Sequence, residues 1–167
     1  MSVTCKKRKT ALPQEKLSEL IKACITYGAA DDGKITKTKL AKLVYLSDFA
    51  YYYDNLKPIT GVDYRKLTYG PVSTDYFDEL TNLELNKVIE VRKTKKEAEV
   101  ISLKGVENIS LSKPELDMVK KVCKKWKDKS TKEIVSFTHN QFPWSIAREN
   151  EKIPYSLIIQ EDASAIF

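Results

Sequence analysis

The sequence has few of the residues on which metal and disulfide sites depend. It holds one histidine, His139, and three cysteines, Cys5, Cys24 and Cys123, in 167 residues. The cysteines are far apart, and none forms a CxxC pair or lies near His139, so the pattern indicates neither a zinc site nor a disulfide framework. We therefore expect no metal and no cofactor, and reduced thiols in a reducing compartment.

Nucleotide-binding motifs and long apolar runs are also missing. No GxxxxGK[ST] or GxGxxG segment occurs, so a phosphate-binding loop is not indicated. No apolar run approaches the ~20 residues that a membrane helix needs, and the first residues lack the apolar segment of a secretory signal. These absences predict a cytoplasmic protein without a membrane partner.

The positive charge is unevenly spread. Of the formal net charge of +6, four cations lie at 6–9, in what we predict to be a flexible basic tail over residues 1–12. The remainder, 13–167, is nearly balanced and is expected to form a single domain. Six more lysines fall between Lys120 and Lys129, where a solvated helix face is the ordinary interpretation and nucleic-acid contact the alternative.

Apolar spacing predicts a mostly α-helical α+β domain. Helices are expected over 14–28 and 36–54, and the second is apolar nearly all round, which places it at the centre. Asp48 is the polar exception on that helix and needs hydrogen-bond donors, from tyrosine hydroxyls, Trp144, His139 or an arginine. It is either a buried structural anchor or a binding-site carboxylate.

The middle of the chain predicts the β structure. A short strand over 62–69 is expected to break at Gly70-Pro71, and a helix capped by Ser73 or Thr74 to end at Asn86. Residues 88–103 predict a β-hairpin with a polar loop. Helix, turn, helix and hairpin together resemble a winged-helix element in outline.

The last third is predicted to be helical. Capping boxes at Ser112–Glu115 and Ser130–Glu133 begin two helices, and Pro154 is expected to begin a final one. Between them lies the stretch THNQFPW, residues 138–144, which holds the only histidine. We expect 138–139 to follow a helix and the stretch to join that helix to the next, as a structural corner.

Catalysis is a weaker interpretation of the same residues. A nucleophilic site would need a cysteine or serine, a histidine and a carboxylate close together. Cys24, Cys123 and Asp48 lie in no segment that resembles a catalytic signature. We predict that the protein is not an enzyme, and keep a hydrolase built on His139 and Asp48 as an alternative.

Several stretches, in order, resemble the Panacea domain, the SocA-like antitoxin domain also described as a phage-associated GepA-like protein. These stretches are KLVYLSDFAYYY, PITGVDYRKLTYGPVSTDYFDEL, a strand pair, LSKPELDMVKKVCKKW, STKEIVSFTHNQFPWSIAREN and KIPYSLI. They cover nearly the whole chain. The recurring residues, which the resemblance assigns to toxin binding or to the structural core without separating the two, are Tyr45, Asp48, Thr60, Gly61, Tyr69, Gly70, Pro71, His139, Pro143 and Trp144.

The resemblance implies the antitoxin of a type II toxin–antitoxin pair. It implies direct binding to a cognate toxin encoded by an adjacent gene, and no enzymatic activity. The founding SocA-like member is instead an adaptor that delivers its toxin to an AAA+ protease, so that partner stays open. This chain departs from the pattern in the aromatic run Phe49–Tyr53, where many relatives have a basic residue, in its basic tail, and in having no room for the additional DNA-binding domain that members often carry.

The runner-up hypothesis is a small basic nucleic-acid-binding regulator, encoded by a phage or prophage. An isoelectric point of about 9.0, the hairpin-loop residues Lys93, Lys95 and Lys96, and the lysine-rich helix favour it. The predicted second and third helices have no arginine, the residue that most often reads guanine, and this counts against specific base recognition. Contact with DNA stays open.

Overall fold

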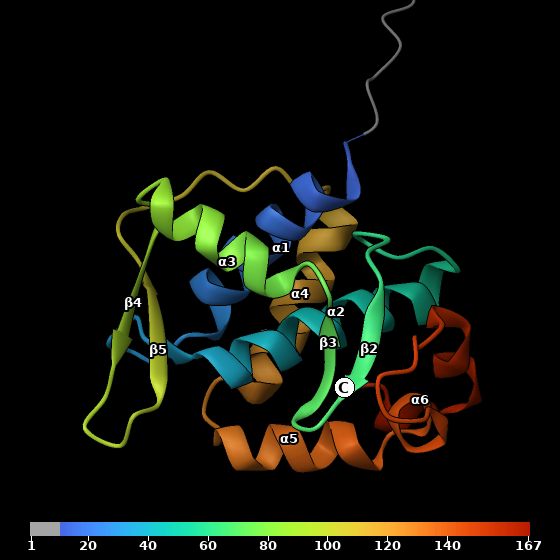
Figure 1. Ribbon diagram of the computed structural model, residues 1–167. Coiled ribbons are helices and arrows are strands. Elements are labelled where there is room, and N and C mark those ends of the chain that lie inside the picture. Colours follow the sequence, from blue (N-terminus) through green and yellow to red (C-terminus); the bar gives the residue numbers. More distant parts are fainter. Residues whose placement is uncertain (1–10) are drawn as a thin grey trace, which may run out of the picture.

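Helices dominate the computed structural model, which describes residues 11–167 (Figure 1). The predicted α+β class with small antiparallel sheets is confirmed. The basic residues of the predicted tail, at 6–9, lie outside the described residues. In chain order the elements are α1 (Pro13–Gly28), β1 (Ile35–Thr36), α2 (Lys37–Asn55), β2 (Tyr64–Leu67), β3 (Gly70–Ser73), α3 (Tyr76–Leu85), β4 (Ile89–Lys93), β5 (Glu99–Leu103), α4 (Lys113–Trp126), α5 (Thr131–Asn140), α6 (Phe142–Ile146) and two 3-10 helices (Tyr155–Gln160 and Ala163–Ala165).

The central helix is α2, as its sequence predicts. Every residue from Lys39 to Tyr51 is buried, because α1, α4, α5 and β3 all pack around it. Figure 1 shows α2 crossing the middle of the molecule, with α4 behind it. The β2–β3 pair lies in front of α2, and the β4–β5 pair lies at the left. A helix enclosed in this way has no polar face, so any charge on it must be satisfied from within the protein.

The predicted hairpin is confirmed as β4 and β5, which with β1 form a sheet in the order β1-β5-β4. Ile35 and Thr36 of β1 pair with Ile101 and Val100 of β5. Ile35, Ile89 and Ile101 turn inward and are buried, so Thr36 and Arg92, on the alternate row of the same register, face outward. The strand β1 was not predicted, since two residues carry no alternation. The winged-helix resemblance stays a prediction.

The predicted short strand is confirmed as β2, which ends at Leu67, but the prediction that Gly70-Pro71 is a break is wrong. Gly70 begins β3, which pairs antiparallel with β2 from Tyr64↔Ser73 to Leu67↔Gly70. Gly70 has a φ of +111°, where an L side chain is strained. Pro71 is tolerated because β3 lies at the edge of a two-stranded sheet.

The predicted helix after β3 is confirmed as α3, but its N-terminus differs from the expected one. Neither Ser73 nor Thr74 is the N-cap, which is Asp75. The Ser73 hydroxyl instead accepts a hydrogen bond from the backbone N–H of Asp75 at 3.2 Å, within the short turn between β3 and α3. The C-cap is Asn86, as predicted.

Both capping boxes are confirmed, at Ser112 and Ser130, but the corner after α5 differs from the prediction. The helix continues to Asn140, so residues 138–139 form its last turn, and Gln141 separates it from the five-residue α6. Gln141 donates to two backbone carbonyls near the C-terminus, both at 2.9 Å, which fixes the break. The segment after Pro154 is a 3-10 helix rather than an α-helix.

Candidate functional site

The side chain of Asp48 is fully buried and accepts hydrogen bonds on both oxygens. Oδ1 accepts from the backbone N–H groups of Ile59 at 2.7 Å and Thr60 at 3.0 Å. Oδ2 accepts from the hydroxyls of Thr60, Tyr64 at 2.9 Å and Tyr155 at 3.1 Å. The carboxylate thus ties α2 to the loop before β2 and to the first 3-10 helix.

Opposing effects act on the Asp48 pKa. Burial raises it, and the hydrogen bonds from Thr60, Tyr64 and Tyr155 oppose this rise without cancelling it, so the pKa of Asp48 stays above its ordinary value. Burial also raises the pKa of both tyrosines, and the nearby carboxylate adds to that effect, so their hydroxyls stay protonated and donate.

Five hydrogen-bond donors surround the Asp48 carboxylate, which supports the structural-anchor interpretation. Of the donors proposed from the sequence, the tyrosine hydroxyls are present, and Trp144 and His139 donate nothing to it.

A second buried charge on α2, Lys42, was missed by the sequence reasoning. Its side chain is fully buried, and Nζ donates to the carbonyl of Pro71 at 3.2 Å. No carboxylate among the described residues forms an ion pair with it. Burial alone lowers the pKa of Lys42 to about 7. The available signal was a lysine within the helix that is otherwise apolar nearly all round.

Gly70 lies directly against this lysine. A Cβ at Gly70 would stand 2.8 Å from Cε and 3.0 Å from Nζ of Lys42, and 3.2 Å from Nε2 of His139. Glycine is therefore required at position 70 for two reasons, the positive φ and the close approach of Lys42 and His139. The β2–β3 hairpin rests on the lysine and the histidine at this point.

The rings of His139 and Trp144 stack, with centroids 4.0 Å apart and planes inclined by 6°. Nζ of Lys66 lies 3.9 Å from the centroid of the indole, a cation–π contact. Burial lowers the pKa of His139; a backbone hydrogen bond with Tyr69 opposes this, and the charges of Lys42 and Lys66 add to it. Within residues 11–167, neither Nε2 of the histidine nor Nε1 of Trp144 has a hydrogen-bond partner.

The structure thus sorts the ten motif residues into two groups joined by α2. Around Asp48 lie Thr60 and Gly61, which turns the loop at a φ of +80°. The other motif residues gather near Lys42 or in the adjoining corner, and they are Tyr69, Gly70, Pro71, His139, Pro143 and Trp144. Tyr45 packs on the aromatic rings beside Asp48, and its buried hydroxyl has no partner among the described residues.

Tyr69 is the only large side chain of the ten that is mostly exposed, at 74%. It borders a pocket of about 190 Å³, which Phe77 and Val72 also line and which reaches Lys42. Phe77 is itself 44% exposed. Two exposed aromatic side chains beside a small hollow are the composition that protein interfaces favour at their energetic centres.

The described residues hold no group of three or more His, Cys, Asp or Glu placed to bind a metal ion. In residues 11–167 no hydrogen bond joins Asp48 to His139, so the geometry does not assemble the acid–histidine pair of the hydrolase hypothesis. None of the helices in this part of the chain is long and apolar enough to span a membrane.

Comparison with known proteins gives the family. A family model described as "Antitoxin SocA-like, Panacea domain" matches residues 40–145. The match spans more than half of the chain and contains all ten motif residues. No curated protein and no solved structure matches the chain. The chain belongs to the SocA-like antitoxin family of Panacea domains.

Proposed function

We propose that this protein is the antitoxin of a type II toxin–antitoxin pair and neutralises its cognate toxin by direct protein–protein binding. The observation that carries the proposal is the family match over residues 40–145. The toxin is encoded by an adjacent gene, and the antitoxin performs no enzymatic reaction. Delivery of the toxin to an AAA+ protease is a variant of the same function, since it begins with the same binding step.

The toxin-contacting part of the motif is the surface around Tyr69 and Phe77. These two side chains are exposed beside a hollow, whereas Asp48 and Thr60 are buried and fully engaged with each other and their neighbours. We therefore assign the Asp48 group to the fold and Tyr69 to binding. A stable pair would bury about 1,200–2,000 Å² in total, so this pocket would be the centre of a larger contact.

Co-expression with the product of the adjacent open reading frame tests the proposal. Growth rescue with a co-purifying complex is the expected result. Rescue accompanied by disappearance of the neighbour, and abolished in a protease-deficient host, would assign the adaptor mechanism. A neighbour that is not toxic and forms no complex would overturn the antitoxin function.

A matched pair of variants locates the contact. Tyr69→Ala should weaken neutralisation, because it removes an exposed aromatic at the pocket. Leu85→Ala is the control, since Leu85 is 75% exposed at the far end of α3 from Phe77. Equal neutralisation by both variants would place the toxin contact elsewhere. Thermal unfolding of each variant shows that the fold is kept.

A further inference from the structure

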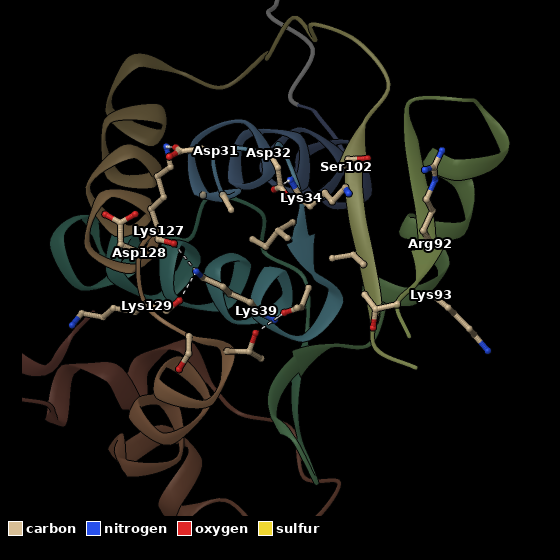
Figure 2. A pocket seen from close by; sticks show the side chains of 18 of the residues that line it. Asp31, Asp32, Lys34, Lys39, Arg92, Lys93, Ser102, Lys127, Asp128 and Lys129 are labelled. Atoms are coloured by element: carbon tan, nitrogen blue, oxygen red, sulfur yellow. Dashed lines mark hydrogen bonds and ion pairs between the residues drawn. The ribbon is translucent and has the colours of Figure 1, made fainter. Parts of the chain in front are cut away.

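A groove of about 950 Å³ contains none of the ten motif residues. One wall is the outward face of β4 and β5 with the hairpin loop. The opposite wall is the end of α4 with the start of α5, and the turn after α1 closes one end. Figure 2 shows these segments surrounding an open space, with Lys39 between the two walls.

Cationic side chains line both walls. Arg92, Lys93 and Lys95 come from the hairpin, and Lys127 and Lys129 from the end of α4. Figure 2 shows the first two and the last two on opposite sides of the space. The basic hairpin loop and the lysine-rich helix, two separate features of the sequence, therefore border a single cavity, and the side chains of Lys93 and Lys129 extend outward from its rim (Figure 2).

Hydrogen bonds connect the residues at the floor of the groove. Lys39 is only 8% exposed, and Nζ donates to the carbonyls of Lys127 at 2.8 Å and Lys129 at 2.6 Å, which closes the C-terminal end of α4. The third N–H of this ammonium has no acceptor in the described part of the chain. Beside it the hydroxyls of Thr36 and Thr131 share a hydrogen bond of 2.7 Å.

The groove concentrates the positive charge of the domain. Seven lysine and arginine residues and three aspartates line it, a net charge of +4. The whole chain carries +6, and its first ten residues supply four of those charges, so residues 11–167 carry +2. All other described residues together are therefore net negative, by two charges. This contrast makes the groove a cationic site, toward which an acidic partner is steered.

We propose that this groove binds an acidic segment of the partner protein, an inference that rests on the proposed antitoxin function. The aspartates that line the groove favour a protein ligand over a nucleic-acid ligand. Asp31 pairs with Lys127 at 3.1 Å, and Asp32 and Asp128 also line the groove. A continuous phosphate backbone would pass close to these carboxylates, whereas a peptide can place its own carboxylates at the lysines and a neutral residue between them.

The groove and the pocket at Tyr69 lie on the two faces of β5. Lys37 and Glu99, which line that pocket, form an ion pair of 2.8 Å. Their chain neighbours Thr36 and Val100 line the groove. Glu99 and Val100 are adjacent in β5 and therefore point to its opposite faces, so a partner that contacts both hollows has to extend around the β4–β5 hairpin.

A charge-reversal pair tests the groove in the complex. Lys93→Glu with Lys129→Glu alters both walls, and Lys121→Glu with Lys124→Glu makes the same change of net charge on exposed residues of α4 outside the groove. With the neighbouring gene product at physiological salt, we expect the groove variant to raise Kd at least about tenfold and the control less than about threefold. Equal effects would overturn the inference and leave the antitoxin function standing.

A deca-glutamate peptide tests the groove independently of the toxin. Amide NMR signals of residues 93–95 and 127–131 should shift on titration, and added salt should reverse the shift. Shifts there without any complex with the neighbour would contradict the antitoxin function and support the groove. No shift there, or a short DNA duplex that displaces the peptide at lower concentration, would overturn the inference in favour of the nucleic-acid hypothesis.

Discussion

Replacing Lys42 by methionine should make the domain more stable. The ammonium is fully buried, has one hydrogen bond to the carbonyl of Pro71, and has no counter-charge among the described residues. Burial displaces its pKa from 10.5 to about 7, which corresponds to about 5 kcal/mol at 1.36 kcal/mol per pKa unit when both states are protonated. Methionine fills similar space without charge. After allowance for the lost hydrogen bond, we expect a gain of about 3 kcal/mol at pH 7.

The same displacement predicts how wild-type stability depends on pH. Above pH 7 the folded protein has lost the proton of Lys42, whereas the unfolded chain keeps it up to pH 10.5. Because the unfolded state binds more protons, the free energy of unfolding rises with pH, by about 2 kcal/mol between pH 7 and 8.5. Lys42→Met should lose this rise.

The histidine, one buried cysteine and two buried tyrosines act outside that window. Burial lowers the pKa of His139, so its contribution changes below its ordinary value of 6.5. Burial raises the pKa of Cys24, Tyr64 and Tyr155, whose folded forms therefore stay protonated, and stability is lost only as pH rises through their ordinary values of 9.0 and 10.0. Burial also lowers the pKa of Lys39 and raises that of Asp48, so the contribution of Lys42 is taken from the difference between wild type and Lys42→Met over this interval.

Urea unfolding at pH 7 and 8.5 measures the effect for wild type, Lys42→Met and Lys124→Met. The last is a control at an exposed lysine of α4, where we expect a change within about 0.5 kcal/mol. A Lys42→Met protein less stable than wild type at pH 7, or a wild-type stability that stays flat or falls in this interval, would refute the assignment of an uncompensated buried charge.

Three further substitutions test the site by urea or thermal unfolding. Asp48→Asn should cost about 3 kcal/mol, because an amide group cannot accept at both positions and leaves buried donors unpaired; unchanged stability would contradict the anchor role. Gly70→Ala should cost about 2 kcal/mol or more, since Cβ would meet Lys42, whereas Gly33→Ala, with φ +76° but open space, should cost about 1 kcal/mol. Trp144→Ala should cost about 3 kcal/mol through the lost stack, and an unchanged melting temperature would assign the ring to an exposed interface.

Local signals account for the elements that the sequence predicts well. The central position of α2 follows from its nearly continuous apolar surface, and the starts of α4 and α5 follow from capping boxes that satisfy their own backbone groups. The need of Asp48 for donors also follows from its place on that helix. Which donors it finds does not, because Thr60 and Tyr155 come from segments that only the folded chain brings together.

Long-range contacts account for what the sequence does not predict. Gly70 resembles a turn residue locally, but it belongs to a strand because the hairpin lies on Lys42 and His139. The helix α5 ends at Asn140 because Gln141 is held by carbonyls about two dozen residues further on. The groove could not be predicted from the sequence for the same reason, since its cationic residues come from segments that are distant in the chain.

The two buried charges of α2 differ in a way that bears on function. Five donors offset part of the cost of burying Asp48 and tie together the loops that it joins, whereas Lys42 has one acceptor and its burial costs stability. A residue that opposes folding and lies under Tyr69, among motif residues, fits a binding site better than a scaffold. Lys42→Met should therefore neutralise the toxin less well despite its higher stability. Higher stability with full neutralisation in the co-expression assay would separate this lysine from the toxin contact.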